Sequence, residues 1–302
     1  MHAMQLVVLA AGHGRRFGGL KQLAPVGPKG EAIMDYTARA AESCGVTGMV
    51  VVIRKEIRSQ VAAHVRRFWP TSLPVEFVEQ PPIPGTAQAV YATHEVIDGT
   101  FGVANADDLY GDAAIGALHR AIDLYAGDED THVLVGYELL QTVLTSQPVT
   151  RGLIEIGEDG HLAGIAEHTI ALRPDGQYDS RPLWSIEPHE TRTFAELAPR
   201  KLTGSERVSM NLWGFHQRIF QHLADALEAF HPETAARSEL LLPDVIGHLV
   251  ATGTDRVQVL PTDGRCMGIT NADDLPILQG ELALSTEARP RANLRAKERG
   301  AV

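Results

Sequence analysis

A glycine-rich stretch directly after a short apolar run is the feature that most restricts how this chain can fold. Residues 4–9 (Met-Gln-Leu-Val-Val-Leu) have the apolar pattern of a buried strand. Glycines follow at positions 12, 14, 18 and 19, together with the cations Arg15, Arg16 and Lys21. Glycine allows a tight turn in which several backbone N–H groups face one anion, and Arg and Lys neutralise its charge. The stretch predicts a phosphate-rich ligand at the end of the first strand, in preference to a surface turn with scattered charges.

Strand-like and helix-like segments alternate through the first third of the chain. Continuous apolar runs predict further strands at 49–53, 73–78 and 101–105, and amphipathic patterns predict helices at 31–41, 56–68 and 87–95. Such alternation is typical of a mostly parallel sheet covered by helices on both faces. We therefore expect an α/β fold, a three-layer α/β/α sandwich with a mostly parallel, mixed central sheet.

The rest of the chain adds a hairpin to this pattern. Residues 152–156 and 161–167 predict a β-hairpin, and further strands are expected at 131–137, 209–215 and 257–260. Helices are expected at 113–125, 216–230, 239–251 and from 273 onward. Residues 170–206 are polar and rich in Pro, Arg and Glu, so they predict a long irregular segment.

No repeat or linker divides the body of the chain. We expect a single domain over residues 1–286. Residues 287–302 carry five cations and almost no apolar side chains, and they predict a flexible basic tail.

Two further segments end at the same edge of the predicted sheet. Asp107 and Asp108 follow the strand at 101–105, and ligands bind open α/β sheets at the carboxyl ends of the strands. Mg²⁺ is often held by one or two carboxylates plus substrate phosphates, so we expect Mg²⁺ as the cofactor and these two carboxylates as its ligands. A proline-rich loop at 79–85 leads into the next helix, for which Thr86 is the expected N-cap.

The composition excludes several classes of protein. The 302 residues carry a net charge of -11, so we expect no nucleic acid as a partner, although a glycine loop with a few cations can still bind a nucleotide. The 2 cysteines, Cys44 and Cys266, form neither a disulfide framework nor a metal cluster. No segment has the pattern of a signal peptide or a membrane span, so we expect a cytoplasmic enzyme. A homo-oligomer stays open, because apolar helix faces have the same pattern in a core and in an interface.

Several segments, in order along the chain, resemble the nucleotidyltransferases that make NDP-sugars from an NTP and a sugar 1-phosphate. Residues 9–21 are similar to the family's first nucleotide loop, residues 85–89 to its second, and residues 105–111 to its metal-binding strand end. Later segments at 160–167, 210–215 and 239–246 are also similar. The resemblance covers about residues 4–280 and implies a Rossmann-like nucleotidyltransferase fold with a β-hairpin insertion that binds the sugar. It also implies a nucleotide-binding half at about 1–110 and a sugar-phosphate-binding half at about 111–286.

The resemblance also implies roles for individual residues. Arg16 would bind the β- and γ-phosphates, Lys21 would stabilise charge near the α-phosphate, and Asp107 would hold Mg²⁺. Further contacts to the nucleotide are implied for Leu9, Ala10, Ala11, Gly12, Gly14, Gln80, Gly85 and Thr86, and contacts to the sugar for Glu167 and Asn211. Gln80 has the alternative of a hydrogen bond within its own loop, and Glu167 and Asn211 have the alternative of structural roles.

Two positions depart from the family pattern. Many relatives have Glu-Lys-Pro where this chain has Glu167-His168-Thr169, and that Lys contacts the sugar phosphate. A neutral His168 would replace it only in part, which leaves Arg151 or Lys201 as alternative cations. Many relatives also have a late Asp as second metal ligand where this chain has Gly268, so Asp108, Asp273 or a water would have to replace it. These departures concern the acceptor more than the reaction.

The sequence leaves the identity of the nucleotide base and of the acceptor open. Gln80 could pair with uracil or thymine, and Glu79 with guanine. The guanine contact gives a guanylyltransferase of a cyclitol 1-phosphate as one alternative. The short spacing from Arg16 to Lys21 is similar to that of cytidylyltransferases, which gives a cytidylyltransferase of an alcohol phosphate as another.

Two other classes of protein compete with this interpretation. An NAD(P)-dependent dehydrogenase would need a glycine in place of Phe17 and an acid where the second strand ends in Arg54. A catalytically silent nucleotide-binding regulator would fit the changes at His168 and Gly268.

Overall fold

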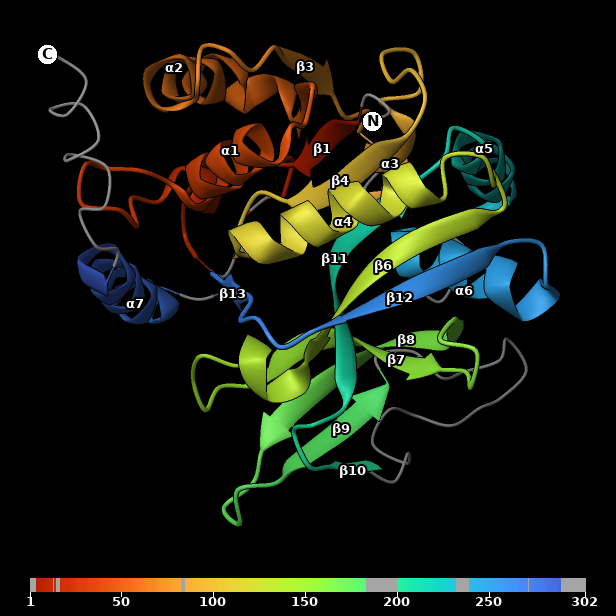
Figure 1. The fold of residues 1–302 in the computed structure, drawn as a ribbon. Coiled ribbons are helices and arrows are strands. Elements are labelled where there is room, and N and C mark those ends of the chain that lie inside the picture. The colour runs from red at the N-terminus through yellow and green to blue at the C-terminus, as the bar shows by residue number, and fades with distance from the viewer. Residues whose placement is uncertain are drawn as a thin grey trace, which may run out of the picture.

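The centre of the fold is a set of parallel strands. The computed structural model describes residues 4–12, 14, 17–82, 85–182, 200–231, 239–270 and 272–288. Strand β1 (Gln5–Leu9) lies between β2 (Gly48–Ile53) and β4 (Phe101–Asn105), and β3 (Val75–Glu79) pairs with β2, all in parallel. These strands belong to an 11-stranded sheet that runs through the molecule (Figure 1). β2 is buried along its whole length, as expected for a parallel strand with helices on both faces.

Strand β11 (Arg207–Phe215) joins this centre to the rest of the sheet. It runs antiparallel to β4 and to β6 (Thr131–Glu138), and β6 pairs in parallel with β12 (Arg256–Thr262). β3, β2, β1, β4, β6 and β12 therefore share one direction, and β11 runs against them. The prediction of a mostly parallel, mixed central sheet is confirmed.

An antiparallel extension lies below the centre in Figure 1. It consists of β7 (Val149–Ile156), β8 (Leu162–Leu172), β9 (Tyr178–Pro182) and β10 (Arg200–Leu202), with β7 paired to β11. The predicted hairpin is therefore present as β7 and β8. The expected irregular segment at 170–206 is wrong for its described parts, because Tyr178, Ser180 and Leu202 are buried and hold β9 and β10 in the sheet. Residues 183–199 lie outside the described part.

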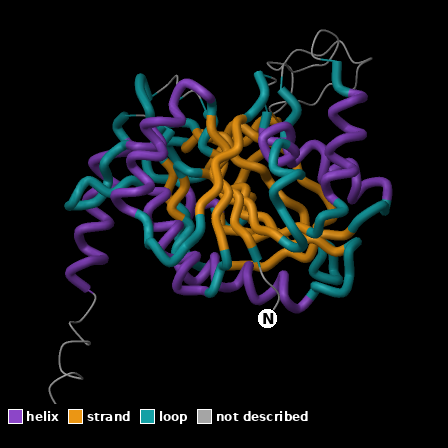
Figure 2. Tube along the Cα trace, turned by 90° about the horizontal axis from the view of Figure 1, so that it is seen from above, coloured by secondary structure: helices purple, strands orange, loops and turns teal. Residues whose placement is uncertain are grey.

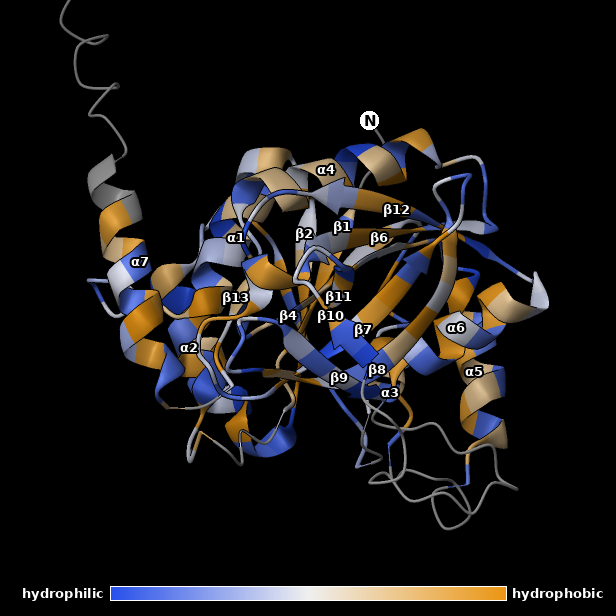
Figure 3. Ribbon diagram, turned by 90° about the horizontal axis from the view of Figure 1, so that it is seen from below, coloured by the Kyte–Doolittle hydropathy of each residue, from blue (hydrophilic) through white to orange (hydrophobic). Residues whose placement is uncertain are grey.

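Helices cover both faces of the sheet. Alternate side chains of β1 and β2, such as Val8 and Val51, pack with α1 (Ile33–Cys44), α2 (Arg58–Phe68) and α4 (Asp112–Leu124). Their neighbours, such as Val7 and Val50, pack with α3 (Thr86–Tyr91), α5 (Ile219–Ala229) and α6 (Leu242–Thr252). Figure 2 shows the strands enclosed by helices, and in Figure 3 α5 and α6 carry both apolar and polar residues. The predicted three-layer sandwich is confirmed.

The C-terminal part packs beside the first loop. β13 (Met267–Gly268) pairs with β5 (Asp108–Leu109), and α7 (Asp274–Ala288) packs Leu278 and Leu282 against Ala24 and Ile33. The helix extends two residues into the predicted tail, and residues 289–302 lie outside the described part. None of the helices in the described ranges is long and apolar enough to cross a membrane.

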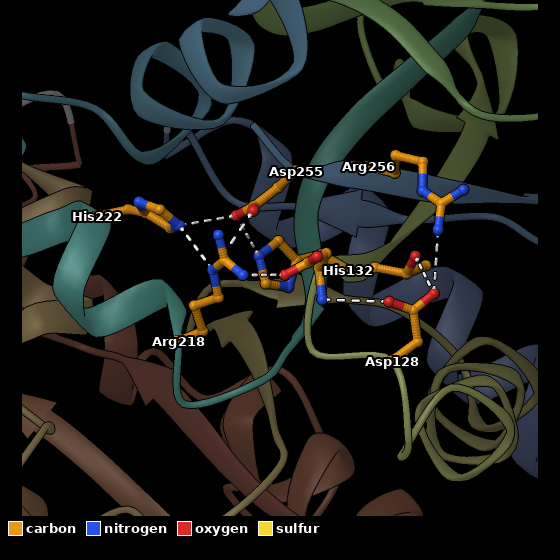
Figure 4. A network of polar contacts seen from close by, with 8 residues as sticks. Asp128, His132, Arg218, His222, Asp255 and Arg256 are labelled. Atoms are coloured by element: carbon orange, nitrogen blue, oxygen red, sulfur yellow. Dashed lines mark hydrogen bonds and ion pairs between the residues drawn. The ribbon is translucent and has the colours of Figure 1, made fainter. Parts of the chain in front are cut away.

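The buried carboxylate of Asp255, directly before β12, contacts side chains of β6 and α5 at the sheet edge where β6 and β12 begin (Figure 4). Asp255 Oδ2 lies 3.2 Å from Nε2 of His132 on β6 and 3.2 Å from Nε2 of His222 on α5. Arg218 Nε lies 3.8 Å from Asp255 Oδ1. Burial raises the pKa of Asp255, but the hydrogen bond from His132 and the charges of His132, His222 and Arg218 outweigh it, so the pKa lies below 3.8.

We expect Asp255→Asn to lower the free energy of unfolding by about 3 kcal/mol at pH 7, because it removes one partner of a buried charge network. The carboxylate has a lower pKa in the folded chain than in the unfolded one, so its stabilisation is complete above pH 3.8 and is lost as the pH falls further. Urea denaturation at pH 7 and pH 3.5 measures both effects. The exposed Asp225→Asn on α5 is the control, and equal effects of the two substitutions would contradict the expectation.

Candidate active site

The loop after β1 closes on itself at Gly14. Gly14 has a φ of 59°, and a Cβ at this position would lie 2.5 Å from the carbonyl oxygen of Gly19. The N–H groups of Phe17 and Gly18 both donate to the Gly14 carbonyl, at 3.0 Å. Only glycine satisfies this backbone conformation and this close approach. The predicted nucleotide contacts at residues 9–12 and 14 all lie at this edge of the sheet.

Two side chains hold the carbonyl groups of this loop. The Gln22 amide donates to the carbonyls of Ala10, at 3.0 Å, and of Gly12, and Arg54 Nε donates to the Ala11 carbonyl at 2.9 Å. In a trans peptide the C=O and the following N–H point in opposite directions. The N–H groups of Ala11 and Gly12 therefore point away from these anchors. Sequence reasoning missed both anchors as loop-holding residues, although Arg54 stands directly after the second strand.

The ends of β1 and β4 bring Lys21 and Asp107 together. Leu9 pairs with Asn105, and the Ala106 N–H donates to the Leu9 carbonyl at 3.1 Å, so both strands end at the same level. Lys21 opens a 3-10 turn (Lys21–Leu23), and its Nζ forms an ion pair with Asp107 Oδ2. Both side chains are about one-fifth exposed, at 22% and 19%. Arg16, the third predicted catalytic residue, lies outside the described residues.

Asp108 occupies the space in front of Gly268. The two residues are paired between β5 and β13, and a Cβ on Gly268 would lie 2.1 Å from Asp108 Oδ1. Asn105 Nδ2 donates to Asp108 Oδ2 at 2.8 Å. Burial, together with the charge of Asp107, raises the pKa of Asp108 to about 6. Asp273, another candidate to replace the missing carboxylate, is exposed in the turn before α7.

The second predicted nucleotide loop packs against the start of α6. Gln80 Nε2 donates to the Gly85 carbonyl at 3.1 Å, so the hydrogen bond within its own loop is present. Gly85 has a φ of 123°, and a Cβ there would lie 2.2 Å from the Leu240 carbonyl oxygen. The prediction of Thr86 as N-cap is wrong, because Gly85 is the N-cap and Thr86 is the first residue of α3. The Thr86 hydroxyl instead accepts a hydrogen bond from the Leu242 N–H, at 2.8 Å, and so caps α6.

Glu167 lies on β8 of the antiparallel extension, and Asn211 lies on β11. β7 pairs with both of these strands. Glu167 pairs with Gly152, which pairs with Ser209, and a Cβ on Gly152 would lie 3.5 Å from Glu167 Oε1 and 3.2 Å from Ser209 Cβ. Gly152, which sequence reasoning missed, thus leaves room beside the Glu167 carboxylate. Asn211 has a φ of 58°, where the register of β11 shifts. A non-glycine residue in this conformation is strained, and such strain often marks a functional site.

The candidate replacements for the cation that many relatives have at position 168 lie in three different environments. His168 is 8% exposed, its Nδ1 lies 2.6 Å from Ser180 Oγ, and burial lowers its pKa, so the imidazole is neutral at pH 7. Arg151 donates from all three guanidinium nitrogens, to Thr142 and to the Thr150 carbonyl. Lys201 is exposed on β10.

The donor set at this edge suits a hard cation. Asp107 and Asp108 offer carboxylate oxygens, the ligands that Mg²⁺ takes together with substrate phosphates. Within the described ranges, no three His, Cys, Asp or Glu side chains come together in a group that could hold a metal ion. The two carboxylates therefore fit a Mg²⁺ ion that the substrate helps to bind, and they do not form a complete protein site.

Part of the chain matches the model of a known protein family. The model of the MobA-like NTP transferase domain matches residues 6–135, which include the glycine-rich loop, Gln80, Gly85 and Asp107. None of the curated proteins matches this chain.

Solved structures share the fold over nearly the whole chain. A candidate glucose-1-phosphate thymidylyltransferase from Bacillus anthracis, in complex with sucrose, is similar with a TM-score of 0.63 and 14% identity, over 93% of this chain and 95% of that one. UDP-glucose pyrophosphorylase complexed with UDP-glucose is similar with a TM-score of 0.62 and 15% identity, over 94% and 100%. The inositol-1-phosphate CTP transferase from T. maritima is similar with a TM-score of 0.63 and 14% identity, over 92% and 96%. At these identities the likeness shows the fold alone, and it confirms the expected Rossmann-like nucleotidyltransferase fold.

The family match covers the glycine-rich loop, the second loop and the strand end that carries Asp107. Residues 6–135 match the model of the MobA-like NTP transferase domain, and the solved structures share the fold over nearly the whole chain. Both comparisons favour a nucleotidyltransferase over the dehydrogenase alternative.

Proposed function

We propose that this enzyme joins an NTP to a sugar 1-phosphate or a sugar-like cyclitol 1-phosphate and releases pyrophosphate. The observation that carries the proposal is the contact of Lys21 with Asp107 at the end of the glycine-rich loop. The acceptor class is supported by the similar structures, whose names refer to glucose 1-phosphate, UDP-glucose and inositol 1-phosphate.

The chemistry needs positioning and charge neutralisation more than an activated nucleophile. A phosphate monoester is largely dianionic at neutral pH, because its second pKa is about 6, so its oxygen attacks the α-phosphorus without a general base. One P–O bond forms to the acceptor phosphate, and the bond between the α- and β-phosphates breaks. Lys21 would neutralise charge at the α-phosphate, the N–H groups of the glycine-rich loop would bind phosphate oxygens, and Arg16 would bind the leaving pyrophosphate.

Asp107 and Asp108 would hold Mg²⁺. The ion would supply positive charge that shields the phosphate oxygens of the nucleotide. Asp107 is supported by its place at the end of β4, and Asp108 by its carboxylate, which takes up the space where a side chain at position 268 would stand. In this way a carboxylate on β5 would take the role that many relatives give to the position of Gly268.

The remaining predicted residues would bind the nucleotide base and the acceptor. The backbone near Gly85 and the Gln80 side chain would contact the base, with Thr86 beside them. Glu167 would bind acceptor hydroxyl groups next to Gly152, and Asn211 would contact the acceptor from β11. A guanylyltransferase of a cyclitol 1-phosphate and a cytidylyltransferase of an alcohol phosphate stay alternatives within this reaction class.

We expect Lys21→Ala to reduce kcat by about 10²- to 10³-fold, because it removes a charge that stabilises the transition state. The measurement is pyrophosphate release over a matrix of ATP, CTP, GTP, UTP and dTTP with sugar, cyclitol and alcohol phosphates, with Mg²⁺ or EDTA. Asp107→Ala should be inactive in the same assay, and the exposed Lys29→Ala is the control. Release by neither the wild type nor Lys29→Ala, although an NTP still raises their Tm, would favour the silent regulator and overturn the proposed reaction.

We expect Asp108→Asn to raise the free energy of unfolding of the metal-free protein by up to about 3 kcal/mol at pH 7.5. A pKa of about 6 in the folded chain, against an ordinary 3.8, means that the folded state binds the proton more tightly. The free energy of unfolding of the wild type therefore falls as the pH rises from 3.8 to about 6, and the neutral variant avoids this loss. Urea denaturation in EDTA measures it, and Asp263→Asn, at a side chain that is 95% exposed, is the control.

A carboxylate exchange tests Asp108 as a metal ligand. We expect Asp108→Gly to weaken Mn²⁺ binding in the presence of the NTP by about tenfold, because one of two carboxylate ligands is lost. The double substitution Asp108→Gly with Gly268→Asp should restore much of this affinity, since it moves the carboxylate back across the β5–β13 pair. Mn²⁺ titration by electron paramagnetic resonance gives the affinities. Unchanged affinity in the single variant would exclude Asp108 as a ligand.

A further inference from the structure

Two strands separate at the site. β4 and β11 are paired from Phe101–Val103 to Trp213–Phe215, but not beyond. From there β4 continues toward Asp107, and β11 shifts its register against β6 between Trp213 and Ser209, around Asn211. The metal-side carboxylates, which follow β4, and the proposed acceptor-side Asn211 on β11 thus lie beyond the point where the two strands stop pairing.

One buried hydroxyl bridges the gap. The Tyr110 hydroxyl accepts a hydrogen bond from the Asn105 N–H at 2.8 Å and donates one to the Met210 carbonyl at 2.8 Å. Tyr110 is 1% exposed. It supplies partners to two backbone groups at the point where β4 and β11 no longer pair, and buried backbone groups without a partner are costly.

Both backbone groups stand next to residues of the proposed site. Asn105 lies two residues before Asp107, and its side chain donates to Asp108. Met210 directly precedes Asn211, whose Oδ1 accepts a hydrogen bond from Trp213 Nε1 at 3.1 Å. A change in either bond of the hydroxyl would therefore move one side of the site relative to the other.

We propose that Tyr110 is a positioning residue that sets the distance between the metal-bound phosphates and the acceptor. The proposal rests on the proposed function, because it assumes that Asp107 and Asn211 serve the two substrates. In-line attack depends on the separation of the reacting atoms, and a displacement of 1 Å can cost about 10²-fold in rate. The hydroxyl touches no substrate in this account and acts through the two strands.

Tyr110→Phe and Tyr137→Phe form a matched pair. Tyr137 is equally buried, at 0%, and its hydroxyl donates to the Tyr110 carbonyl at 3.1 Å, so its removal deletes a buried hydroxyl but leaves both bonds of the Tyr110 hydroxyl in place. We expect Tyr110→Phe to lower kcat by about 10- to 100-fold and to raise KM for the acceptor, with the affinity for the Mg²⁺–NTP complex within about twofold of wild type. Tyr137→Phe should keep kcat and both KM values within about twofold.

Hydrogen exchange gives a readout that does not need activity. Tyr110→Phe should accelerate exchange of the Asn105 amide by about tenfold or more, because this N–H loses its acceptor, and exchange in the segment 207–215 should rise with it. Tyr137→Phe should leave both segments near wild type. Amide exchange by mass spectrometry or NMR on the full chain measures this.

The outcomes separate the two proposals. Unaltered exchange in Tyr110→Phe, or a kcat and acceptor KM equal to those of Tyr137→Phe, overturns the positioning role. A wild-type protein that releases no pyrophosphate with any substrate pair overturns the proposed function and, with it, the role of Tyr110 in positioning the substrates. In that case faster exchange in Tyr110→Phe would still show a structural bridge between β4 and β11.

Discussion

The common end point of two parallel strands is the constraint on which the site depends. β1 and β4 are paired in register up to Leu9 and Asn105, so the segments that follow them must leave the sheet at the same level. The glycine-rich loop follows β1, and Asp107 follows β4. Lys21 of this loop forms an ion pair with Asp107, although the two residues are 86 positions apart in the sequence. The location of the proposed phosphate chemistry is thus a consequence of strand register.

The second side of the site exists because β11 does not follow β4 to its end. β11 pairs with β4 at Trp213–Phe215 and with β7 at Val208–Ser209. Between these two pairings, the Tyr110 hydroxyl provides hydrogen-bond partners for the Asn105 N–H and the Met210 carbonyl. Where β5 pairs with β13, the Asp108 carboxylate occupies the space beside Gly268. In both places a side chain provides what the neighbouring backbone or side chain does not: the Tyr110 hydroxyl provides hydrogen-bond partners, and Asp108 provides a carboxylate.

The order of strands and helices could be predicted from the sequence, as could the residues at the strand ends. Apolar runs and glycines act over a few residues, so β1, β2, β4 and the turn at Gly14 follow from local patterns. The errors arose where the structure of a segment depends on contacts with residues outside that segment. Residues 178–182 look irregular alone, but Tyr178 and Ser180 are buried against β8. Thr86 has the residue type of an N-cap, yet its hydroxyl caps α6, whose first residue is 156 positions away.

The amino-acid sequence alone indicated the proposed chemistry: a glycine loop with cations, a carboxylate pair after a buried strand, and His168 where many relatives have a cation. These are properties of residue types and short spacings. Only the tertiary structure decided how they are held. Gln22 and Arg54 bind the carbonyls of residues 10–12, Arg151 is committed to Thr142 and Thr150, and Tyr110 joins Asn105 to Met210. Such contacts depend on how strands and turns lie in space, because a hydrogen bond requires two groups within about 3 Å of each other, whatever their separation along the chain.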